Sequence, residues 1–421
     1  MNHAYLKRFG DDRYQHFSYG DPIQEQHYFK KRGAGTHLST LKDKWQNGEA
    51  RPIERLCFWV FHMVETIHRI DFNSKYYFHT FTPKARNLPS IKIGIIYKGQ
   101  LYYFHPLTNE VHVRPNTSIR LSSSKAQVIL FSDDSTTQYY YGEFHKMLSA
   151  LNAGHALFNV EYALWEIDAS YRYQEYVALA KNEERQFNAT HLSIVAAIEV
   201  DLMDASQLMS TTNLNESLFI IKKMNQMPLK NLSKVFMGIN EQQFQSRSAV
   251  QSQGGDLVFN KQLPKQAFEQ LIRQLQQILP ETSIELKLFI NDVEYMKKGY
   301  YALTKNAIEL IKETQSETEH NRILKEYIQF TNLQGFNIWV FHILENPEQL
   351  TNLNESFHVM GMIGQLVSVS VAGEGFAARC MKNYDDDYLK AQMGLSKKAL
   401  ITYSTVIFPN NNFSQAIHIT E

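Results

Sequence analysis

The pattern of apolar and polar residues predicts the same order of elements twice along the chain. Residues 88–113 read as Leu-Pro, a short strand, a turn, a Tyr-Tyr strand and a polar turn into another strand, and residues 279–311 read the same way. A further apolar strand is predicted from Ala126 (AQVILFSDD) and again from Phe336 (FNIWVFHILEN). The two series indicate an internal duplication.

The spacing of matching residues supports this duplication. The two apolar strands just described are 210 positions apart, and so are Gly154 and Gly364. After each of these glycines, apolar residues recur at helical spacing, and a tyrosine-bearing polar segment then opens a second helix. The turn glycines Gly99 and Gly299 are 200 positions apart. Similar offsets in the same order indicate two copies that differ by small insertions.

Chain length agrees with a two-domain organisation. At 421 residues, the chain is longer than a single hydrophobic core usually supports. We predict a first unit with an N-terminal leader at residues 1–203, a connection at 204–240 and a second unit at 241–421. The connection is rich in Asn, Ser and Lys and has no matching element in either copy.

Composition excludes several classes of protein. Lys plus Arg and Asp plus Glu are equal at 43 each, so no overall field attracts nucleic acid or an anionic membrane. No apolar run is long enough for a membrane span. Cys57 and Cys380 stand far apart, which predicts neither a disulfide framework nor a zinc site and suits a reducing cytoplasm. No HExxH, Walker loop, GxSxG or dinucleotide fingerprint occurs.

The order of elements resembles the nitroreductase superfamily, and within it the streptolysin-type and microcin-type azoline oxidases. In that family a unit opens with an Arg-Ser pair, followed by a Pro-Ser loop, a hairpin, a strand, a helix near Ala-Gly-His and a polar Tyr-Asp-Asp segment. The segments that fill these places are Phe244–Val250, Leu88–Ser90, Ala153–His155 and Tyr384–Asp387. The similarity spans most of the chain and rests on the order of these segments.

The resemblance implies an α+β fold built as a tandem of two diverged nitroreductase-like α/β units that form a pseudo-dimer. It also implies FMN as the cofactor, bound where the units meet. Members of the family are ordinarily homodimers with two equivalent sites, and a fused tandem can supply both walls of a site from one chain.

Five residues are the candidates for binding FMN. An anionic phosphate needs cationic side chains or helix-end amides, and the flavin ring needs donors near its reducible nitrogen. Arg247 with Ser248 fits this demand best, supported by Gln251, and the alternative is a solvated arginine on a polar surface loop. Arg379 and Lys382 occupy the later position at which the family supplies phosphate contacts, and the alternative is a basic helix end.

Tyr141 and Tyr140 are the candidate catalytic residues. Oxidation of an azoline to an azole removes a Cα proton and passes a hydride to the flavin, which requires a nearby base. The azoline oxidases use a Lys-Tyr pair before a glycine, and here that place reads Tyr140-Tyr141-Gly142, with tyrosine instead of lysine. An unperturbed phenol, with a pKa of roughly 10, is a poor base at neutral pH. A cross-strand aromatic cluster is the structural alternative.

These observations lead us to expect an FMN-dependent oxidase or dehydrogenase. Its substrate would be a thiazoline or oxazoline in a peptide or in a carrier-bound nonribosomal intermediate, and its partner a cyclodehydratase or a nonribosomal synthetase. A flavin-free, degenerate scaffold that recognises a peptide is one alternative, and an NAD(P)H-dependent nitroreductase is another.

Overall fold

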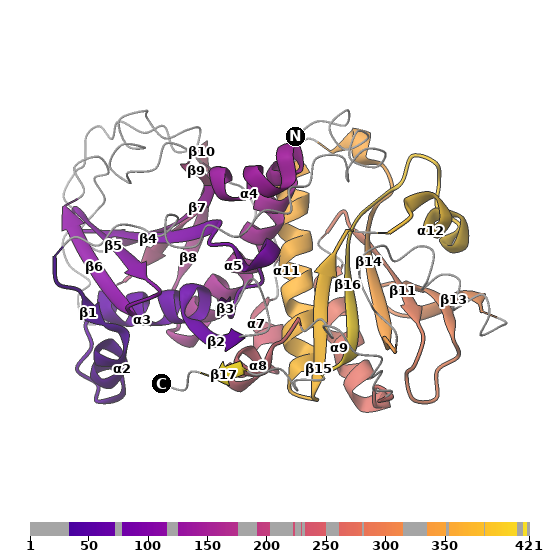
Figure 1. Cartoon of the computed structure of the whole chain (residues 1–421), viewed down its shortest axis with the longest axis horizontal. Helices are drawn as coiled ribbons and strands as arrows, with labels where there is room; N and C mark the ends of the chain where they lie inside the picture. Colours follow the sequence, from indigo (N-terminus) through magenta and orange to yellow (C-terminus); the bar gives the residue numbers. More distant parts are fainter. Residues whose placement is uncertain are drawn as a thin grey trace. The chain divides into compact units, whose positions relative to one another are not determined.

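The computed structural model describes most of the chain and divides into two compact units (Figure 1). The described residues are 33–71, 78–115, 125–175, 192–202, 222–223, 229, 232–249, 261–279, 282–314, 335–350, 353–382, 384–410 and 416–418. Gln251 lies outside them. The N-terminal unit contains the described residues from 33 to 223 together with 416–418, and the C-terminal unit contains those from 229 to 410. The limits that we predicted from the sequence remain a proposal.

The N-terminal unit is built on a sheet of eight strands among its described residues, in the order β1-β6-β5-β4-β7-β9-β8-β10. Every pairing in this sheet is antiparallel. Its elements are β1 (Thr36–His37), α2 (Leu38–Gln46), α3 (Pro52–Glu65), β2 (Ile67–Asp71), β3 (Phe78–Thr80), η3 (Ala85–Asn87), β4 (Ile91–Tyr97), β5 (Gln100–His105), β6 (Glu110–Pro115), β7 (Lys125–Asp133), α4 (Asp134–Tyr141), η4 (Gly142–Phe144), α5 (His145–Glu166), β8 (Tyr171–Glu175), β9 (Leu192–Asp201) and β10 (Lys222–Lys223).

Two helices form the core of this unit, α3 and α5, which pack against each other and against the sheet. Helix α3 begins with Pro52 in its first turn, where the missing N–H of proline costs nothing, and Glu54 accepts the backbone N–H of Arg51 at 2.9 Å. Helix α5 is buried without interruption from Met147 to Leu164 except at its half-buried Leu148. A helix that is buried on every side is expected at the centre of a domain.

The C-terminal unit contains a sheet of six strands among its described residues, in the order β13-β12-β11-β14-β16-β15, again with antiparallel pairings. Its elements are α7 (Leu232–Phe236), α8 (Glu241–Ser246), α9 (Lys265–Ile278), β11 (Glu285–Ile290), β12 (Gly299–Leu303), β13 (Ile308–Glu313), β14 (Ile338–Leu344), η7 (Pro347–Gln349), α11 (Leu353–Ala372), β15 (Phe376–Met381), α12 (Asp386–Met393) and β16 (Leu400–Pro409).

The two sheets share one topology, which confirms the duplication. The order β6-β5-β4-β7-β9-β8 in one unit corresponds strand by strand to β13-β12-β11-β14-β16-β15 in the other. A helix precedes the first hairpin in each unit, α3 or α9, and a long buried helix follows the fourth strand, α5 or α11. The strands predicted from Ala126 and Phe336 are β7 and β14.

The first hairpin accounts for the difference in glycine offsets. In the N-terminal unit Lys98 and Gly99 form a tight turn, both with positive φ, as two-residue hairpins require. In the C-terminal unit the connection runs from 291 to 298, and Gly299 is the first residue of β12 and not part of the turn. A Cβ on Gly299 would lie 2.4 Å from the carbonyl oxygen of Lys312, so the close approach of two backbones requires glycine.

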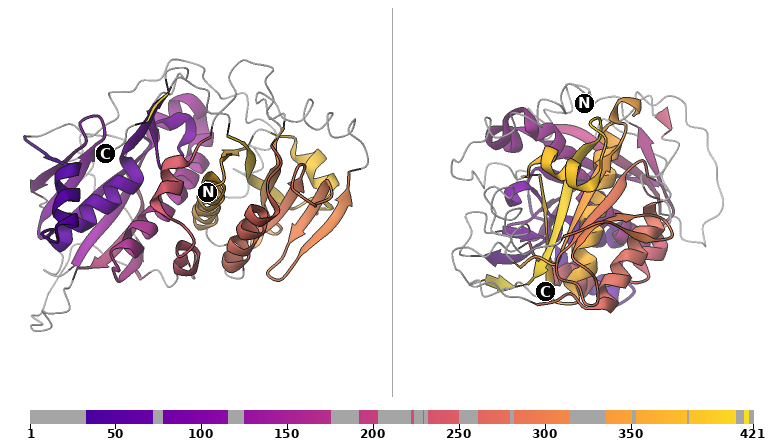
Figure 2. Two further views of the ribbon diagram at one scale, coloured as in Figure 1. Left: turned by 90° about the horizontal axis from the view of Figure 1, so that it is seen from below. Right: turned by 90° about the vertical axis from the view of Figure 1, so that its right-hand side faces the viewer.

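The sheet of the C-terminal unit is covered on both faces (Figures 1 and 2). Trp339, Phe341 and Ile343 point to one face of β14, where they share a core with Leu389 and Met393 of α12. The opposite face packs against α11, as the contact of Thr402 Oγ1 with Met360 Sδ at 2.9 Å shows. Because successive side chains of a strand point to opposite faces of the sheet, each residue of β15 faces either α12 or α11.

The end of the chain returns to the N-terminal unit. Strand β17 (Ala416–His418) pairs antiparallel with β2, which pairs in turn with β3, so these strands form a separate sheet of three. Among the helices in the described part of the chain, none combines the length and the apolar character that a membrane span needs.

Candidate functional site

The candidate catalytic tyrosines lie in the last turn of α4. Tyr140 is 2% exposed, Tyr141 is half-buried, and the neighbouring Tyr139 is 56% exposed. Gly142 ends the helix with φ 52° and ψ −137°, a conformation that favours glycine. The alternative of a cross-strand aromatic cluster is wrong, because these tyrosines are helical and not part of the sheet.

Arg86 lies against the rings of both tyrosines, and it is not among the site residues predicted from the sequence. Its guanidinium lies 4.9 Å from the ring centroid of Tyr140 and 5.1 Å from that of Tyr141, both within the range of a cation–π interaction. Arg86 and Asn87 both have positive φ, at 53° and 52°, which is strained backbone for residues other than glycine. Arg86 sits just before the Leu-Pro-Ser segment, and nothing in the sequence signals its conformation.

The loop that carries Arg86 is held by side chains of α5. Asn152 Oδ1 accepts the backbone N–H of Ala85 at 3.3 Å, and Asn159 Nδ2 donates to Thr82 Oγ1 at 3.0 Å. His155 Nδ1 lies 3.0 Å from the carbonyl oxygen of Pro83, which makes this histidine a structural residue that binds backbone. The expectation that the helix opens near Ala153–His155 is wrong, because α5 already begins at His145.

In the C-terminal unit, Arg247 and Ser248 follow α8 and are buried, with exposed fractions of 4% and 1%. The alternative of a solvated arginine on a surface loop is therefore wrong. The carbonyl oxygen of Ser248 accepts the backbone N–H of Ala378 at 3.0 Å, which fixes this pair beside β15. Burial raises the pKa of the Cys380 thiol, and the positive charge of Arg247 acts in the opposite direction, so Arg247 lies near this residue of β15.

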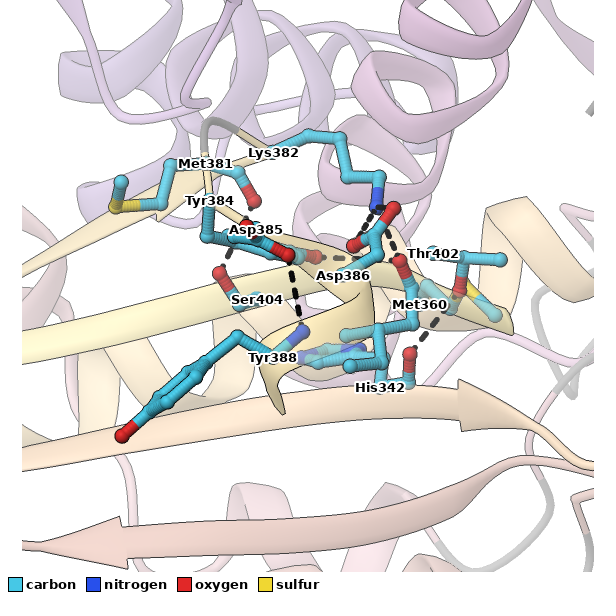
Figure 3. Close-up of polar contacts among 11 residues, drawn as sticks. His342, Met360, Met381, Lys382, Tyr384, Asp385, Asp386, Tyr388, Thr402 and Ser404 are labelled. Carbon is cyan, nitrogen blue, oxygen red and sulfur yellow. Dashed lines mark hydrogen bonds and ion pairs between the residues drawn. The ribbon is translucent and has the colours of Figure 1, made fainter. Parts of the chain in front are cut away.

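Arg379 lies on β15 and Lys382 directly after it, so the alternative of a basic helix end is wrong. The ammonium of Lys382 donates to both carboxylate oxygens of Asp386, at 2.6 and 2.7 Å, and to the carbonyl oxygen of Ile401 (Figure 3). It also lies 4.5 Å from the ring centroid of Tyr384. Lys382 therefore has an internal counterion, which reduces the charge that it offers to a phosphate.

The candidate residues that lie at or beside β15 meet some of the requirements for binding an anionic cofactor. A buried guanidinium, Arg247, beside the buried hydroxyl of Ser248 and the strand that carries Arg379 provides donors of the kind that bind phosphate. Lys382 fits this role less well, since Asp386 already neutralises it. Gln251 lies outside the described residues. Arg247, Ser248 and Arg379 therefore have the chemistry that a phosphate group requires, and their assignment to FMN stays a prediction.

The N-terminal unit also contains a buried group of charges that the sequence did not reveal. Lys92 Nζ and Asp133 Oδ2 are 2.6 Å apart, with side chains 6% and 5% exposed. Glu65, at the end of α3, is 4% exposed, and burial raises its pKa to about 8, although the charge of Lys84 opposes this rise. Within the described residues, no group of three or more His, Cys, Asp or Glu side chains could hold a metal ion.

Comparison with known proteins identifies the fold. No family model and no curated protein sequence matches the chain. A protein from Anabaena variabilis described as a nitroreductase has a similar structure, with a TM-score of 0.69 and 14% sequence identity over 96% of this chain and 98% of that one.

Two further solved structures match only part of the chain. The microcin synthetase complex of Escherichia coli has a TM-score of 0.29 and 13% identity over 41% of this chain and 81% of that chain. A protein from Ralstonia eutropha described as a nitroreductase has a TM-score of 0.27 and 15% identity over 39% and 88%. These two scores are too low to contribute to the argument. The full-length similarity and the repeated topology show that the chain is a tandem of two diverged units of the nitroreductase-like α+β fold.

Proposed function

We propose that this protein is an FMN-dependent oxidoreductase that converts a thiazoline or oxazoline into a thiazole or oxazole. The observation that carries this proposal is the end of α4, where Tyr141 directly precedes Gly142, the first residue of η4, and Arg86 lies against the ring of Tyr141. The same position resembles the place at which azoline oxidases have their Lys-Tyr pair. The nitroreductase-like fold supports oxidoreductase chemistry in general.

The roles of the residues follow from the chemistry of the reaction. Bound FMN would accept the hydride, and dioxygen would reoxidise it. Arg247, Ser248 and Arg379 would bind the phosphate through charge-assisted hydrogen bonds. In its deprotonated form, the phenolate oxygen of Tyr141 would take the Cα proton of the substrate, directly or through water, and Arg86 would fix the ring. The substrate would be a peptide or carrier-bound intermediate supplied by a cyclodehydratase or a nonribosomal synthetase.

A second candidate function is a flavin-free scaffold that recognises a peptide. The pairing of Lys382 with Asp386 favours it, because one of the expected phosphate contacts is already neutralised. The replacement of the family's lysine by Tyr140 is consistent with lost catalysis as well. The two candidates predict different behaviour of the purified protein toward FMN.

Reconstitution with FMN tests the proposal. We expect a bound flavin with an absorbance band at about 450 nm, and a thiazoline-containing peptide should yield a product lighter by about 2 Da with consumption of dioxygen. Protein that takes up no FMN but binds the peptide would support the scaffold and contradict the oxidase. Rapid bleaching by reduced nicotinamide without azoline turnover would instead indicate a nitroreductase.

Substitution of Tyr141 tests the residue assignment. Tyr141→Phe should reduce turnover by about 10²-fold or more while leaving flavin content unchanged, since it removes only the phenol oxygen. Tyr139→Phe is the matched control, because Tyr139 is exposed on the same turn of α4. Equal turnover of the two variants would remove Tyr141 from the mechanism.

A further inference from the structure

Helix α4 ends in three tyrosines and contains no basic residue of its own. A cation reaches this end of the helix from η3, whose Arg86 stands 54 positions before Tyr140 in the sequence. The guanidinium carbon of Arg86 lies 4.9 Å from the ring centroid of Tyr140 and 5.1 Å from that of Tyr141. An arginine side chain in a protein keeps its charge at every accessible pH. The fold therefore places a permanent positive charge against both rings.

The place of this charge is fixed by strained backbone. Arg86 has a φ of 53°, a left-handed conformation that costs free energy in a residue other than glycine. Asn152 of α5 accepts the backbone N–H of Ala85 at 3.3 Å, and His155 Nδ1 lies 3.0 Å from the carbonyl oxygen of Pro83. Contacts with α5 thus stabilise a strained residue at the point where its charge meets two phenols.

Burial distinguishes the two tyrosines. Tyr140 is 2% exposed, and removal from water disfavours the charged form of a phenol. Tyr141 is only half-buried, so its side chain keeps part of the contact with water that stabilises a phenolate. The same cation can therefore hold Tyr140 in place as a neutral phenol and favour loss of the proton from Tyr141.

The other ionisable side chains near the end of α4 have weaker means of acting on the half-buried ring. Glu143 of η4 and Lys146 of α5 are exposed and opposite in charge, so water and salt screen both. Asp134 lies at the opposite end of α4 and accepts hydrogen bonds from two serine hydroxyls, at 2.7 and 3.0 Å. His145 Nδ1 donates to a backbone carbonyl oxygen at 2.6 Å. We expect the guanidinium of Arg86 to be the strongest of these influences.

We propose that Arg86 acts through Tyr141 by stabilising its phenolate, and so makes this side chain the proton acceptor of the site. An opposite charge within about 4–6 Å favours the ionised form of a titratable group. A shift of about 1 pH unit raises the phenolate fraction at neutral pH about tenfold. In this role Arg86 is a positioning residue. The inference rests on the proposed function, in which Tyr141 takes the Cα proton, but the ionisation of Tyr141 can be measured without flavin or substrate.

Fluorine NMR of the full chain, with 3-fluorotyrosine at position 141 only, tests the effect of Arg86. The midpoint of its titration should lie about 1 pH unit or more below that of the same labelled chain denatured in urea. Arg86→Met should raise the midpoint by about 1 pH unit, and Arg86→Lys, which keeps a charge, should retain part of the shift. Lys146→Met is the control for lost charge, and it should move the midpoint by less than about 0.3 pH unit because this ammonium is exposed. A midpoint at or above that of the denatured chain, or the same midpoint in folded Arg86→Met as in the unaltered protein, would overturn the proposal.

The flavin-loaded protein separates this inference from the proposed function. With a thiazoline-containing peptide, kcat/KM should rise with pH to a plateau, and Arg86→Met should move the midpoint of this rise upward by about 1 pH unit. Turnover with the same pH profile in both proteins would refute the role of Arg86 and leave the oxidase intact. A protein whose Tyr141 titrates as expected but which takes up no FMN would refute the oxidase and leave the effect of Arg86 intact.

Discussion

Removal of the buried lysine Lys92 of β4, which pairs with Asp133 just before α4, should destabilise the N-terminal unit strongly. Lys92→Met keeps an unbranched side chain of similar length but leaves the carboxylate of Asp133 without its ammonium partner at 2.6 Å. Because both side chains are nearly inaccessible, at 6% and 5% exposure, water cannot replace the lost partner. The expected loss is about 3–5 kcal/mol, compared with about 0–1 kcal/mol for a surface pair.

Hydrogen-exchange mass spectrometry gives a local measurement, which suits a protein with two units that need not unfold together. Protection should fall in peptides that cover β4 and α4. The double variant with Asp133→Asn removes both charges and should recover most of the stability, leaving a loss below about 1.5 kcal/mol. A loss below about 1 kcal/mol in Lys92→Met, or a double variant no more stable than the single one, would refute the reasoning.

Three further predictions concern single side chains. Arg86→Met should lower the free energy of unfolding by only about 1–2 kcal/mol, the value of two cation–π contacts, but should clearly lower azoline turnover. Unfolding and turnover assays on the same purified protein check both expectations. Asp386→Asn should free Lys382 and strengthen FMN binding in a flavin fluorescence titration; unchanged binding would leave Lys382 a structural residue. Burial raises the pKa of Glu161 to about 7, so the folded state holds the extra proton and stability falls as pH rises from about 4.5 to 7. Glu161→Gln should remove this pH dependence, so the difference in the free energy of unfolding between pH 5 and pH 8, measured by urea unfolding, should shrink by on the order of 3 kcal/mol.

The topology could be predicted from the sequence because apolar periodicity reports which face of a strand or helix is buried. The sequence predicts the correct order for the two hairpins, the strands β7 and β14 and the helices after them, although it places the start of α5 too late. The second helix that it predicts in the first copy is wrong, because Tyr171–Glu175 form strand β8, whereas the matching segment of the second copy does open a helix, α12. Gly154 suggested an opening of α5 at that position, but the apolar residues from Met147 onward are already helical and buried. A glycine inside a buried helix is tolerated when packing stabilises the helix.

The site was harder to predict because burial of a polar residue depends on distant segments. Arg247 stands in a Gln- and Ser-rich sequence that is typical of a surface, yet the backbone of Ser248 pairs with Ala378, 130 positions later. Arg86 is recognisable only from its backbone conformation and from its distance to the two tyrosines. Neither relation leaves a periodic signal along the chain.

The two units share a topology but differ in the polar residues on their central helices. In α5, Asn152, His155 and Asn159 bind the loop that carries Arg86. The residues 210 positions later in α11 are Met362, Gln365 and Val369. The buried serines of α11 bond instead to carbonyl groups of their own helix, as Ser368 does to Gly364 at 2.8 Å. Side chains that satisfy their own helix cannot hold a neighbouring loop in a strained conformation, whereas those of α5 can. The network that fixes Arg86 over Tyr141 is therefore a property of the N-terminal unit that α11 does not reproduce, which supports the proposal that Tyr141 of this unit is the proton acceptor.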